Sequence, residues 1–565
     1  MKTCLTLLLC AALLTGCGST TVTEITAETA APTAAAQNPI PAASPFDAPD
    51  YVSRFSSVTE ILLSDDGITV NGGSETDSVF TSHDIIYYED RDMYDSGNPY
   101  GEGTDADKHK PEEAAAHTVV NITAPGTYRL TGKLSAGQIR IDLGEGAFED
   151  PDAVAEIILG DADITCTVAP AILFLNTYEC DGNWSADTAN PGVDTSAAGA
   201  NLILEGENTV SGSYVAKIFK DKDGEKKLWK QDGAIYSYMS MNVFGPGALE
   251  LNAANEGLDT ELHLTINGGD IIINSGNDGI NTNEDGVSVT TINSGNLTIF
   301  AGLGAEGDGI DSNGYLVING GNVIASAKPA SDAGLDSDLG SYIHGGTVIA
   351  TGSAMDWAES DSNQVTINLQ FARQQAAGSE IRITTEDGTE VFAFTPTGEN
   401  IRGFSGLILS DPSLKQGDTY SVYVDGAQMT YTGTDVMRGP GGFGGRPGGM
   451  PEGFEPGEMP ENFEPGQMPS LPDGETFPAA YDPSNREGRG QRPDSMTPPA
   501  DNGAPALPGN MTPPELPEDQ TLPDREFSQA GFAGRGQGNG DPGEPSAEFY
   551  MNDMVNFFSG VTTAQ

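Results

Sequence analysis

The hydrophobic positions of residues 255–352 recur with a fixed period. Four segments share an Ile-x-(Gly/Ser)-Gly pattern followed by apolar and β-branched residues, and they start at 266, 292, 318 and 343, so they lie 26, 26 and 25 residues apart. A second pattern interleaves with the first. It consists of an aliphatic residue, then Asp or Asn, then Thr or Ser, and it follows Gly257, Gly279, Gly309 and Gly334. Each period therefore holds short runs typical of strands, separated by glycine-containing turns.

This period favours one architecture. A unit of about 25 residues made of short strands and tight turns cannot bury an apolar face alone, but stacked copies can share one continuous core. Leucine-rich repeats need a Leu-x-x-Leu-x-Leu pattern that is absent here, and β-propeller blades need about 40 residues. We therefore predict an all-β protein whose main domain, residues 49–362, is a right-handed parallel β-helix.

The regions beside the regular repeats differ from them in composition. Residues 50–235 are β-rich but less regular, and we expect them to form the first, degenerate coils or an N-terminal cap. Residues 363–436 should form an antiparallel C-terminal cap, because the open end of a solenoid exposes unpaired strand edges. Residues 437–547 are rich in Pro, Gly, Glu and Met and should be a disordered tail, whereas residues 548–565 regain aromatic side chains and could dock on the body.

The N-terminus carries an export signal. Lys2 is followed by the apolar run Leu5 to Leu14, which is too short to span a bilayer, and then by Thr15-Gly16-Cys17. This arrangement resembles the lipobox of bacterial lipoproteins. The resemblance implies a signal peptide over residues 1–16, lipidation of Cys17, and a Thr/Ala/Pro-rich tether over residues 17–48. We therefore expect a lipid-anchored protein on the extracellular face of a bacterial membrane.

The repeats should place acidic and amide side chains in columns. If the aliphatic residue of the second pattern points inward, the next residue points outward. One outward column would then hold Asp259, Asn281, Asp311 and Asp336. Two residues further on, a second column would hold Glu261, Asn283, Asn313 and Asp338. The adjacent turns contribute Asp278, Asp285, Asp308 and Asp332.

These columns suggest a metal site. Stacked carboxylates about 4.8 Å apart repel one another. A hard divalent cation would reverse the sign of that interaction, and Asp, Asn and carbonyl oxygens are the ligands that calcium takes. The segment Asn281-x-Asn283-x-Asp285-Gly286 also resembles the first half of a calcium loop. The alternative is that these residues only form turns and solubilise one face. We expect calcium as the cofactor.

The bulk composition excludes some partners. The formal net charge is −57, from 83 acidic and 26 basic residues, so nucleic acid is excluded as a partner and the membrane is reached only through the lipid anchor. We expect a monomer. Cys166 and Cys180 are the only cysteines outside the first 17 residues. Export would permit a disulfide between them, and two separate small buried side chains fit the spacing equally.

A family resemblance rests on several segments in order along the chain. They are Gln138-Ile-Arg-Ile-Asp, Ala155-Glu-Ile-Ile-Leu-Gly-Asp, Ala234-Ile-Tyr-Ser-Tyr and the repeated Gly-Ile-Asp-Ser units. Together they resemble the bacterial "carbohydrate-binding domain-containing" β-helix proteins, over residues 55–435. The resemblance implies a polysaccharide-lyase-like, calcium-binding solenoid that binds plant cell-wall or acidic polysaccharide without catalysis. The second motif position is often basic in that family and is Asp or Asn here, which favours a cation bridge or a neutral glycan.

Two further functions remain as alternatives. A calcium-dependent polysaccharide lyase or a glycoside hydrolase shares this type of fold, but the regular repeats offer only Lys328 as a base. A non-binding surface scaffold or adhesin would explain the long tail. Sugar binding needs flat aromatic surface, for which the candidates are Trp229, Tyr342 and Trp357. We expect a binding protein rather than an enzyme.

Overall fold

The structure is a computed structural model of the chain. It describes residues 51–88, 107–183, 185–186, 189–222, 225–304, 306–329, 331–353, 356–398, 400–434 and 545–564, without the side chains of 217–230. The predicted signal peptide, Cys17, the tether and residues 437–544 of the predicted tail lie outside the described residues.

The protein is all-β, which confirms that prediction, and it has almost no helix. The helical elements in the described parts are α1 (Pro111–Ala114) and the 3₁₀ turn η2 (Ala147–Glu149). No helix in the described ranges is both long and apolar enough to cross a membrane. The remaining elements are strands, and many of them pair in parallel.

One set of parallel strands carries the second sequence pattern. From β4 onward its members pair in parallel in chain order, and β3 adds an antiparallel strand at one end. The strands are β3 (Val79–Ser82), β4 (Thr118–Ile122), β6 (Gly137–Asp142), β8 (Ile172–Asn176), β13 (Gly233–Ser237), β16 (Glu256–Thr260), β18 (Ile280–Thr282), β20 (Ile310–Ser312) and β23 (Leu335–Ser337). The repeated motif residues therefore lie side by side in successive strands.

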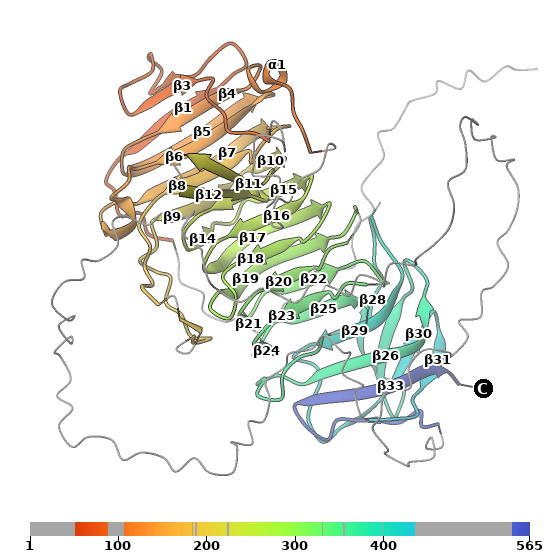
Figure 1. Ribbon diagram of the computed structural model, residues 1–565. Helices are drawn as coiled ribbons and strands as arrows, with labels where there is room; N and C mark the ends of the chain where they lie inside the picture. Colours follow the sequence, from red (N-terminus) through yellow and green to blue (C-terminus); the bar gives the residue numbers. More distant parts are fainter. Residues whose placement is uncertain are drawn as a thin grey trace, which may run out of the picture. The chain divides into compact units, whose positions relative to one another are not determined.

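A second set of parallel strands carries the first pattern. Figure 1 shows these strands following one another from the orange to the green part of the chain. They are β5 (Gly126–Leu134), β7 (Ala155–Thr165), β9 (Ala200–Glu205), β10 (Glu207–Gly212), β14 (Met241–Phe244), β15 (Ala248–Ala253), β17 (Leu264–Ser275), β19 (Val289–Phe300), β21 (Tyr315–Ile318), β22 (Asn322–Ser326), β24 (Gly340–Ile343) and β25 (Thr347–Gly352).

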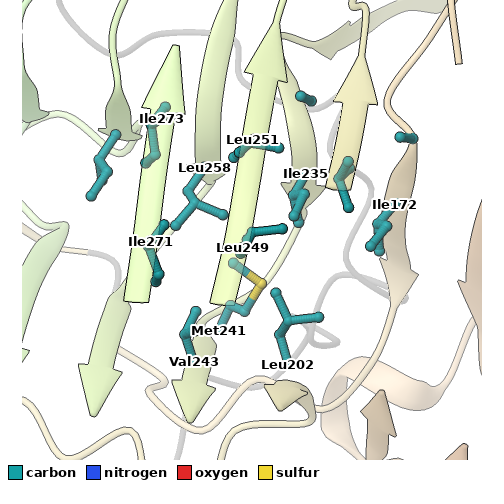
Figure 2. Packing of buried hydrophobic residues seen from close by; sticks show 14 of the residues in the cluster. Ile172, Leu202, Ile235, Met241, Val243, Leu249, Leu251, Leu258, Ile271 and Ile273 are labelled. Atoms are coloured by element: carbon teal, nitrogen blue, oxygen red, sulfur yellow. The ribbon is translucent and has the colours of Figure 1, made fainter. Parts of the chain in front are cut away.

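The register places aliphatic residues of successive repeats next to one another. Ile235 pairs with Leu258, and Ile280 continues the same row. In the second set, Leu249 pairs with Ile271. All of these side chains are buried in one core, and Figure 2 shows Leu258, Leu249 and Ile271 pointing into it from different strands. Stacking thus gives each repeat the apolar partner that it lacks alone.

The glycine that precedes each aliphatic motif residue is required by close backbone approach. A Cβ atom at Gly279 would lie 2.6 Å from the carbonyl oxygen of Gly309 and would overlap the side chain of Ile299. Gly257 and Gly309 meet the backbone of the following repeat in the same way. Only a residue without Cβ fits between successive repeats at this position.

Antiparallel strands flank both ends of the parallel stack. At the N-terminal end, β1 (Val58–Leu63) pairs in parallel with β5 and antiparallel with β2 (Thr69–Val70). At the other end, β29 (Phe404–Ser410) pairs antiparallel with β25 and with β26 (Thr366–Gln375). The further strands β27 (Ile381–Thr385), β28 (Glu390–Phe394), β30 (Thr419–Val424) and β31 (Ala427–Thr430) also pair antiparallel. The free edge of the last parallel strand is thereby covered.

The C-terminal segment is part of the antiparallel region. Strand β33 (Val555–Thr563) pairs in parallel with β26, and β32 (Phe549–Tyr550) pairs with β30. Phe549 and Phe558 lie 4.9 Å apart between ring centroids, and both contact the ring of Tyr431. Residues 548–564 therefore dock on the body through both backbone pairing and aromatic contacts.

Two smaller features complete the described chain. Strands β11 (Val215–Lys222) and β12 (Glu225–Gln231) form an antiparallel hairpin inserted between β10 and β13. Cys166 is buried and Cys180 is half-buried, and both are free thiols, so the disulfide left open by the sequence is not formed in this structure.

Candidate functional site

The acidic columns predicted from the repeats are present in the strand register. Asp259 pairs with Asn281, Asn281 with Asp311, and Asp311 with Asp336 across strands β16, β18, β20 and β23. We use the term acidic edge for this column and the acidic residues around it: Asp232, Glu256, Asp259, Asp278, Asn281, Asp308, Asp311, Asp332, Asp336 and Asp356. Its regular spacing follows directly from the parallel pairing of the repeats.

Much of the acidic edge is buried. The exposed fraction is 0% for Asp259, 7% for Asp278 and 5% for Asn281. Asp311, Asp332 and Asp336 are half-buried. A surface that only solubilises the protein would expose its carboxylates, so solubility alone does not explain the buried part of the column.

Three carboxylates meet at one end of the acidic edge. Asp232, Glu256 and Asp259 are all buried, and each offers one oxygen to a group of atoms that lie within 4.8 Å of one another. Within the described residues, the Oε2 atom of Glu256 has no hydrogen-bond partner, and neither has Oδ1 of the neighbouring Asn281. Buried acceptors without donors are costly, and a hard cation would satisfy them.

The protonation behaviour of the edge reflects this crowding. Burial, together with the charges of Asp311, Glu256 and Asp308, raises the pKa of Asp278 well above its usual range. Burial and the charges of Asp336 and Asp311 do the same to the pKa of Asp308. Without a cation, the edge therefore holds more protons than isolated carboxylates would at the same pH.

Asp356 also belongs to this edge. Burial, followed by a hydrogen bond with Asp336 and the charges of Asp336, Asp308 and Asp311, raises the pKa of Asp356 to about 9. Asp356 lies on the segment that leads from β25 to β26, so the acidic edge draws a residue from beyond the last regular repeat.

The turn residues have a structural role as well. Asp278 Oδ1 accepts a hydrogen bond from the backbone of Asp308 at 2.7 Å, and Asp308 Oδ1 accepts one from Ala333 at 2.5 Å. Asp332 Oδ2 accepts one from Gly307 at 2.9 Å. Each turn carboxylate therefore ties one repeat to its neighbour, in agreement with the turn-forming alternative, and keeps further oxygen lone pairs for a ligand.

The predicted second column is less uniform. Asn283 is buried, and its amide donates to Asp259 Oδ1 at 2.5 Å. Asn313 and Asp338 are half-buried, and Asn313 donates to the carbonyl oxygen of Asn283 at 3.0 Å. Asp285 is exposed, so the structure does not bring it into the buried group with Asn281 and Asn283 that the calcium-loop resemblance suggested.

Three residues of the edge were missed by sequence reasoning. Asp232 and Glu256 directly precede glycines, as Asp278 and Asp308 do, and this acid–Gly pair is the signal that could have found them. Asp356 has no such signal, because the loop that carries it reaches the edge only through the fold.

One basic residue also lies near the edge. Burial lowers the pKa of Arg402, and the charge of Asp332 opposes that shift. Arg402 precedes β29, and the same segment touches the repeats where Asn400 donates to Asn274 Oδ1 at 2.7 Å. The C-terminal region thus supplies a guanidinium that the repeats themselves lack.

The predicted aromatic residues differ in their placement. Tyr342 is half-buried, and its ring centroid lies 6.1 Å from that of Tyr315 and 6.3 Å from that of His344. Trp357 is partly buried against the main core, and its ring meets Phe557 edge-on at 6.3 Å. Trp357 therefore has a packing role in this structure. The side chain of Trp229 lies outside the described part.

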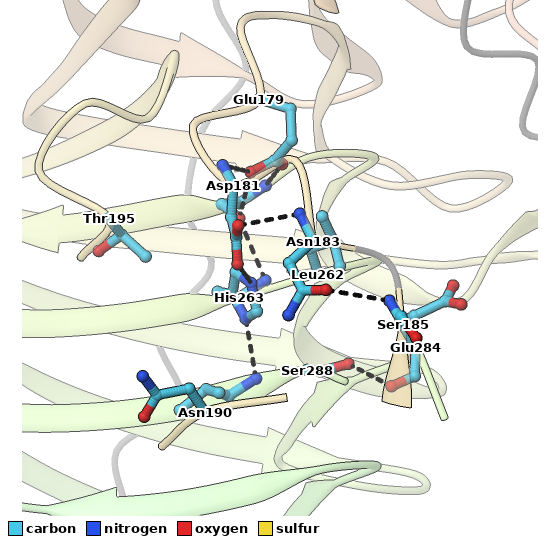
Figure 3. A network of polar contacts seen from close by, with 12 residues as sticks. Glu179, Asp181, Asn183, Ser185, Asn190, Thr195, Leu262, His263, Glu284 and Ser288 are labelled. Atoms are coloured by element: carbon cyan, nitrogen blue, oxygen red, sulfur yellow. Dashed lines mark hydrogen bonds and ion pairs between the residues drawn. The ribbon is translucent and has the colours of Figure 1, made fainter. Parts of the chain in front are cut away.

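A polar network fixes the loop that follows β8. Glu179 is 5% exposed, and its carboxylate accepts hydrogen bonds from the backbone and hydroxyl of Ser240 at 2.7 and 2.8 Å. His263 Nδ1 accepts from the backbone of Val289 at 3.0 Å, so Nε2 carries the hydrogen and faces Asp181 at 3.2 Å. Figure 3 shows this chain of contacts between the loop and the repeats. His263, which directly precedes β17, therefore has a structural role.

One comparison with known proteins, a family model, indicates a carbohydrate-related class. Residues 116–391 match a family model described as "Carbohydrate-binding domain-containing protein". No curated protein matches the chain. A solved structure described as the polysaccharide lyase-like protein from C. thermocellum, gadolinium derivative, is 20% identical, with a TM-score of 0.29, and the match covers 53% of this chain and 94% of that one.

Proposed function

We propose that the protein is a cell-surface polysaccharide-binding protein that holds calcium at its acidic edge and is not an enzyme. The observation that carries the proposal is the buried cluster of Asp232, Glu256 and Asp259, beside an oxygen of Asn281 that has no hydrogen-bond partner in the described part of the chain. The match of residues 116–391 to a carbohydrate-binding family model supports the class of ligand.

The donor set at the edge fits calcium. Asp, Glu and Asn oxygens are hard ligands, and calcium accepts six to eight of them in flexible geometry. A buried cluster of carboxylates is unfavourable without a counter-charge, because desolvation and mutual repulsion add together. Asp232, Glu256 and Asp259 would hold a buried ion, which would mainly stabilise the repeats.

The other end of the edge is open to a ligand. Asp311, Asp332 and Asp336 are half-buried, so a cation held there would be reached from solvent. Bound calcium supplies a positive centre to which sugar hydroxyl or carboxylate oxygens can coordinate. This assignment explains how a surface with a strong negative charge could retain an acidic glycan.

We also propose the handedness of the repeats and the cellular location of the protein. Crossover connections between parallel strands of one sheet are right-handed in about 98% of cases. We accordingly assign the parallel repeats to a right-handed β-helix. The lipobox at Cys17 would anchor this domain, as a monomer, on the outer face of a bacterial membrane.

Affinity electrophoresis tests the proposal. The full chain is run through native gels containing polygalacturonate, with calcium or with a chelator. We expect retardation in calcium that disappears in chelator, and loss of retardation in the double variant Asp311→Asn/Asp336→Asn. Asp270→Asn, an exposed residue of β17, is the matched control and should behave as wild type. Migration on polygalacturonate that does not change with calcium would contradict the proposal, and absence of retardation on every glycan tested, with or without calcium, would favour a scaffold.

A calcium-dependent lyase is the second candidate, and Arg402 is the observation that favours it. A lyase of this type removes a proton beside a sugar carboxylate with a basic group near calcium. Arg402 lies close to Asp332, and its pKa is lowered by burial. Release of an unsaturated product that absorbs in the ultraviolet, abolished in Arg402→Ala, would establish this activity in place of simple binding.

A further inference from the structure

A cavity of about 250 Å³ lies outside the apolar core, on a different face of the repeats from the acidic edge. Its floor is the outward face of β14, β17 and β19, and its walls are the chain segments around residues 51–54 and 193–196. Its lining residues include Tyr51, Phe244, Asn242, Thr265, Asn267 and Thr291. None of them belongs to the acidic edge.

The floor of the cavity is a polar ladder. Thr195 Oγ1 lies 2.7 Å from both Asn242 Oδ1 and Thr265 Oγ1. Beside this group, Asn293 donates its amide to Asn267 Oδ1 at 2.8 Å. Within the described residues, the amide nitrogen of Asn267 and the hydroxyl of Thr291 have no protein partner and are left for a ligand.

The aromatic wall of the cavity is formed by Tyr51 and, at the end of the floor strand β14, by Phe244. The rings of Tyr51 and Phe244 are both half-buried, with centroids 5.5 Å apart. The buried carboxylate of Glu156 accepts from the Tyr51 hydroxyl at 2.8 Å and from the Arg54 backbone at 2.8 Å. Arg54 in turn donates to the carbonyl oxygen of Ser196 at 3.0 Å, which joins the two wall segments. The cavity is therefore formed before any ligand binds.

The polar ladder continues along the stack beyond the cavity. Asn319 donates to Asn293 Oδ1 at 2.9 Å, one repeat further along. In the next column, Thr291 pairs with Val317 and Val317 with Tyr342. The half-buried rings of Tyr315, Tyr342 and His344 lie at that end. Neighbouring strands are about 4.8 Å apart, which is comparable to the length of one sugar unit in an extended glycan chain.

We propose that this cavity binds a sugar ring of a neutral glycan whose chain runs along the ladder toward Tyr342, independently of calcium. The aromatic wall offers a flat surface for the C–H face of the sugar, and the amides and hydroxyls of the floor pair with its hydroxyl groups. The buried Glu156 carboxylate accepts hydrogen bonds from Tyr51, Ser53, Thr127 and the Arg54 backbone, and the charged Arg54 and Asp194 lie in the walls, so the floor itself presents neutral donors and acceptors. This inference deepens the proposed function and rests on it only for the class of ligand.

The test is affinity electrophoresis of the full chain in chelator, through native gels containing a soluble β-glucan, a xyloglucan or a galactomannan. We expect at least one of these glycans to retard the wild type. Thr291→Arg, which fills the cavity, should weaken that binding about tenfold or more, and Phe244→Ala should weaken it as well. Thr298→Arg lies on the same strand β19 but outside the cavity and should bind as wild type.

Two results would overturn the inference: no retardation of the wild type by any of these neutral glycans in chelator, or equal binding by Thr291→Arg and Thr298→Arg. Thermal unfolding measures whether each variant is folded. If Thr291→Arg is not folded, Phe244→Ala provides the test in its place. Calcium-dependent retention on polygalacturonate is measured separately. If the wild type shows no such retention, the proposed function is contradicted and the cavity proposal is unaffected. If Thr291→Arg keeps the retention, the cavity and the calcium site are separate.

Discussion

Glu256 shows how a single buried carboxylate can have opposite effects with and without a cation. Its Oε2 atom is buried and has no hydrogen-bond partner among the residues that the structure describes, and Asp232 and Asp259 offer oxygens beside it. Replacing it by the isosteric amide in Glu256→Gln removes one negative charge without opening a cavity. In chelator the variant should be at least as stable as the wild type, because an uncompensated buried charge has been removed.

In calcium, the wild type should be more stable than Glu256→Gln. A ligand at 100 times its dissociation constant stabilises the folded state by about 2.7 kcal/mol, and Glu256→Gln should lose most of that gain. Differential scanning calorimetry in calcium and in chelator measures both effects. Glu250→Gln, an exposed residue of the neighbouring strand β15, is the control and should keep the full gain. An undiminished calcium gain in Glu256→Gln would remove this residue from the site.

Asp356 makes a pH prediction with a definite sign. Its pKa is raised from 3.8 to about 9, so the folded state favours the protonated form. The stability that this proton provides is complete below the unfolded-state pKa and is lost as the pH rises toward 9. In chelator, the unfolding temperature should therefore fall between pH 5 and pH 9. Asp278 and Asp308, whose pKa values are also raised, add to the same trend.

The variant Asp356→Asn should make that fall shallower. Asp387→Asn is a suitable control, because Asp387 is fully exposed and hydrogen bonds lower its pKa, which places its titration below this window. Unfolding curves at several pH values in chelator provide the measurement. An unfolding temperature that stays constant or rises from pH 5 to pH 9 would show that the carboxyl groups of the acidic edge do not interact as described.

At the scale of the strand, the glycine of the repeated motif is a steric requirement. In Gly279→Ala, the new methyl group would meet the carbonyl oxygen of Gly309 and the side chain of Ile299. Overpacking of this kind costs about 1–3 kcal/mol, and it should displace Asn281, two residues along, from its column. Gly146→Ala is the control, since a Cβ there meets nothing within 4 Å. Equal denaturant midpoints for the two variants would contradict the close packing of the repeats.

Strands and their register were predictable from the sequence because stacking preserves the period. The partners of Asp259, Asn281, Asp311 and Asp336 in the structure are those that the repeat spacing predicts. Equivalent backbone positions recur every 22 to 30 residues here, as the residue numbers of Asp259, Asn281 and Asp311 show. Alignment of the motifs therefore gives the strand pairing. The all-β class followed from the same observation.

The remaining parts of the site depend on contacts that no local pattern encodes. Asp356 and Arg402 come from loops after the last regular repeat, and the loop from Glu179 to Ser196 folds back over repeats far along the chain. The burial of Asp259 was unexpected for the same reason, since an outward position in a strand is covered only when another segment packs over it. The cavity beside Tyr51 likewise requires segments that lie more than 200 residues apart in sequence (51 and 267).

Across the whole molecule, equivalent positions of successive parallel strands hold different types of side chain. The column that ends in acidic residues begins with Asn121, Arg140, Leu173 and Tyr236 in the earlier strands. Because Tyr236 pairs with Asp259, the change from apolar to acidic occurs between β13 and β16. The fold therefore supplies a regular frame, and the variation among repeats decides where a cation could bind.

An anomalous-scattering map from a crystal of the protein soaked in calcium tests the cation site directly. We expect a calcium peak coordinated by Asp232, Glu256 and Asp259, with a further peak at the half-buried end of the acidic edge near Asp311 and Asp336. Absence of any peak among these carboxylates at millimolar calcium would show that the acidic edge is not a cation site.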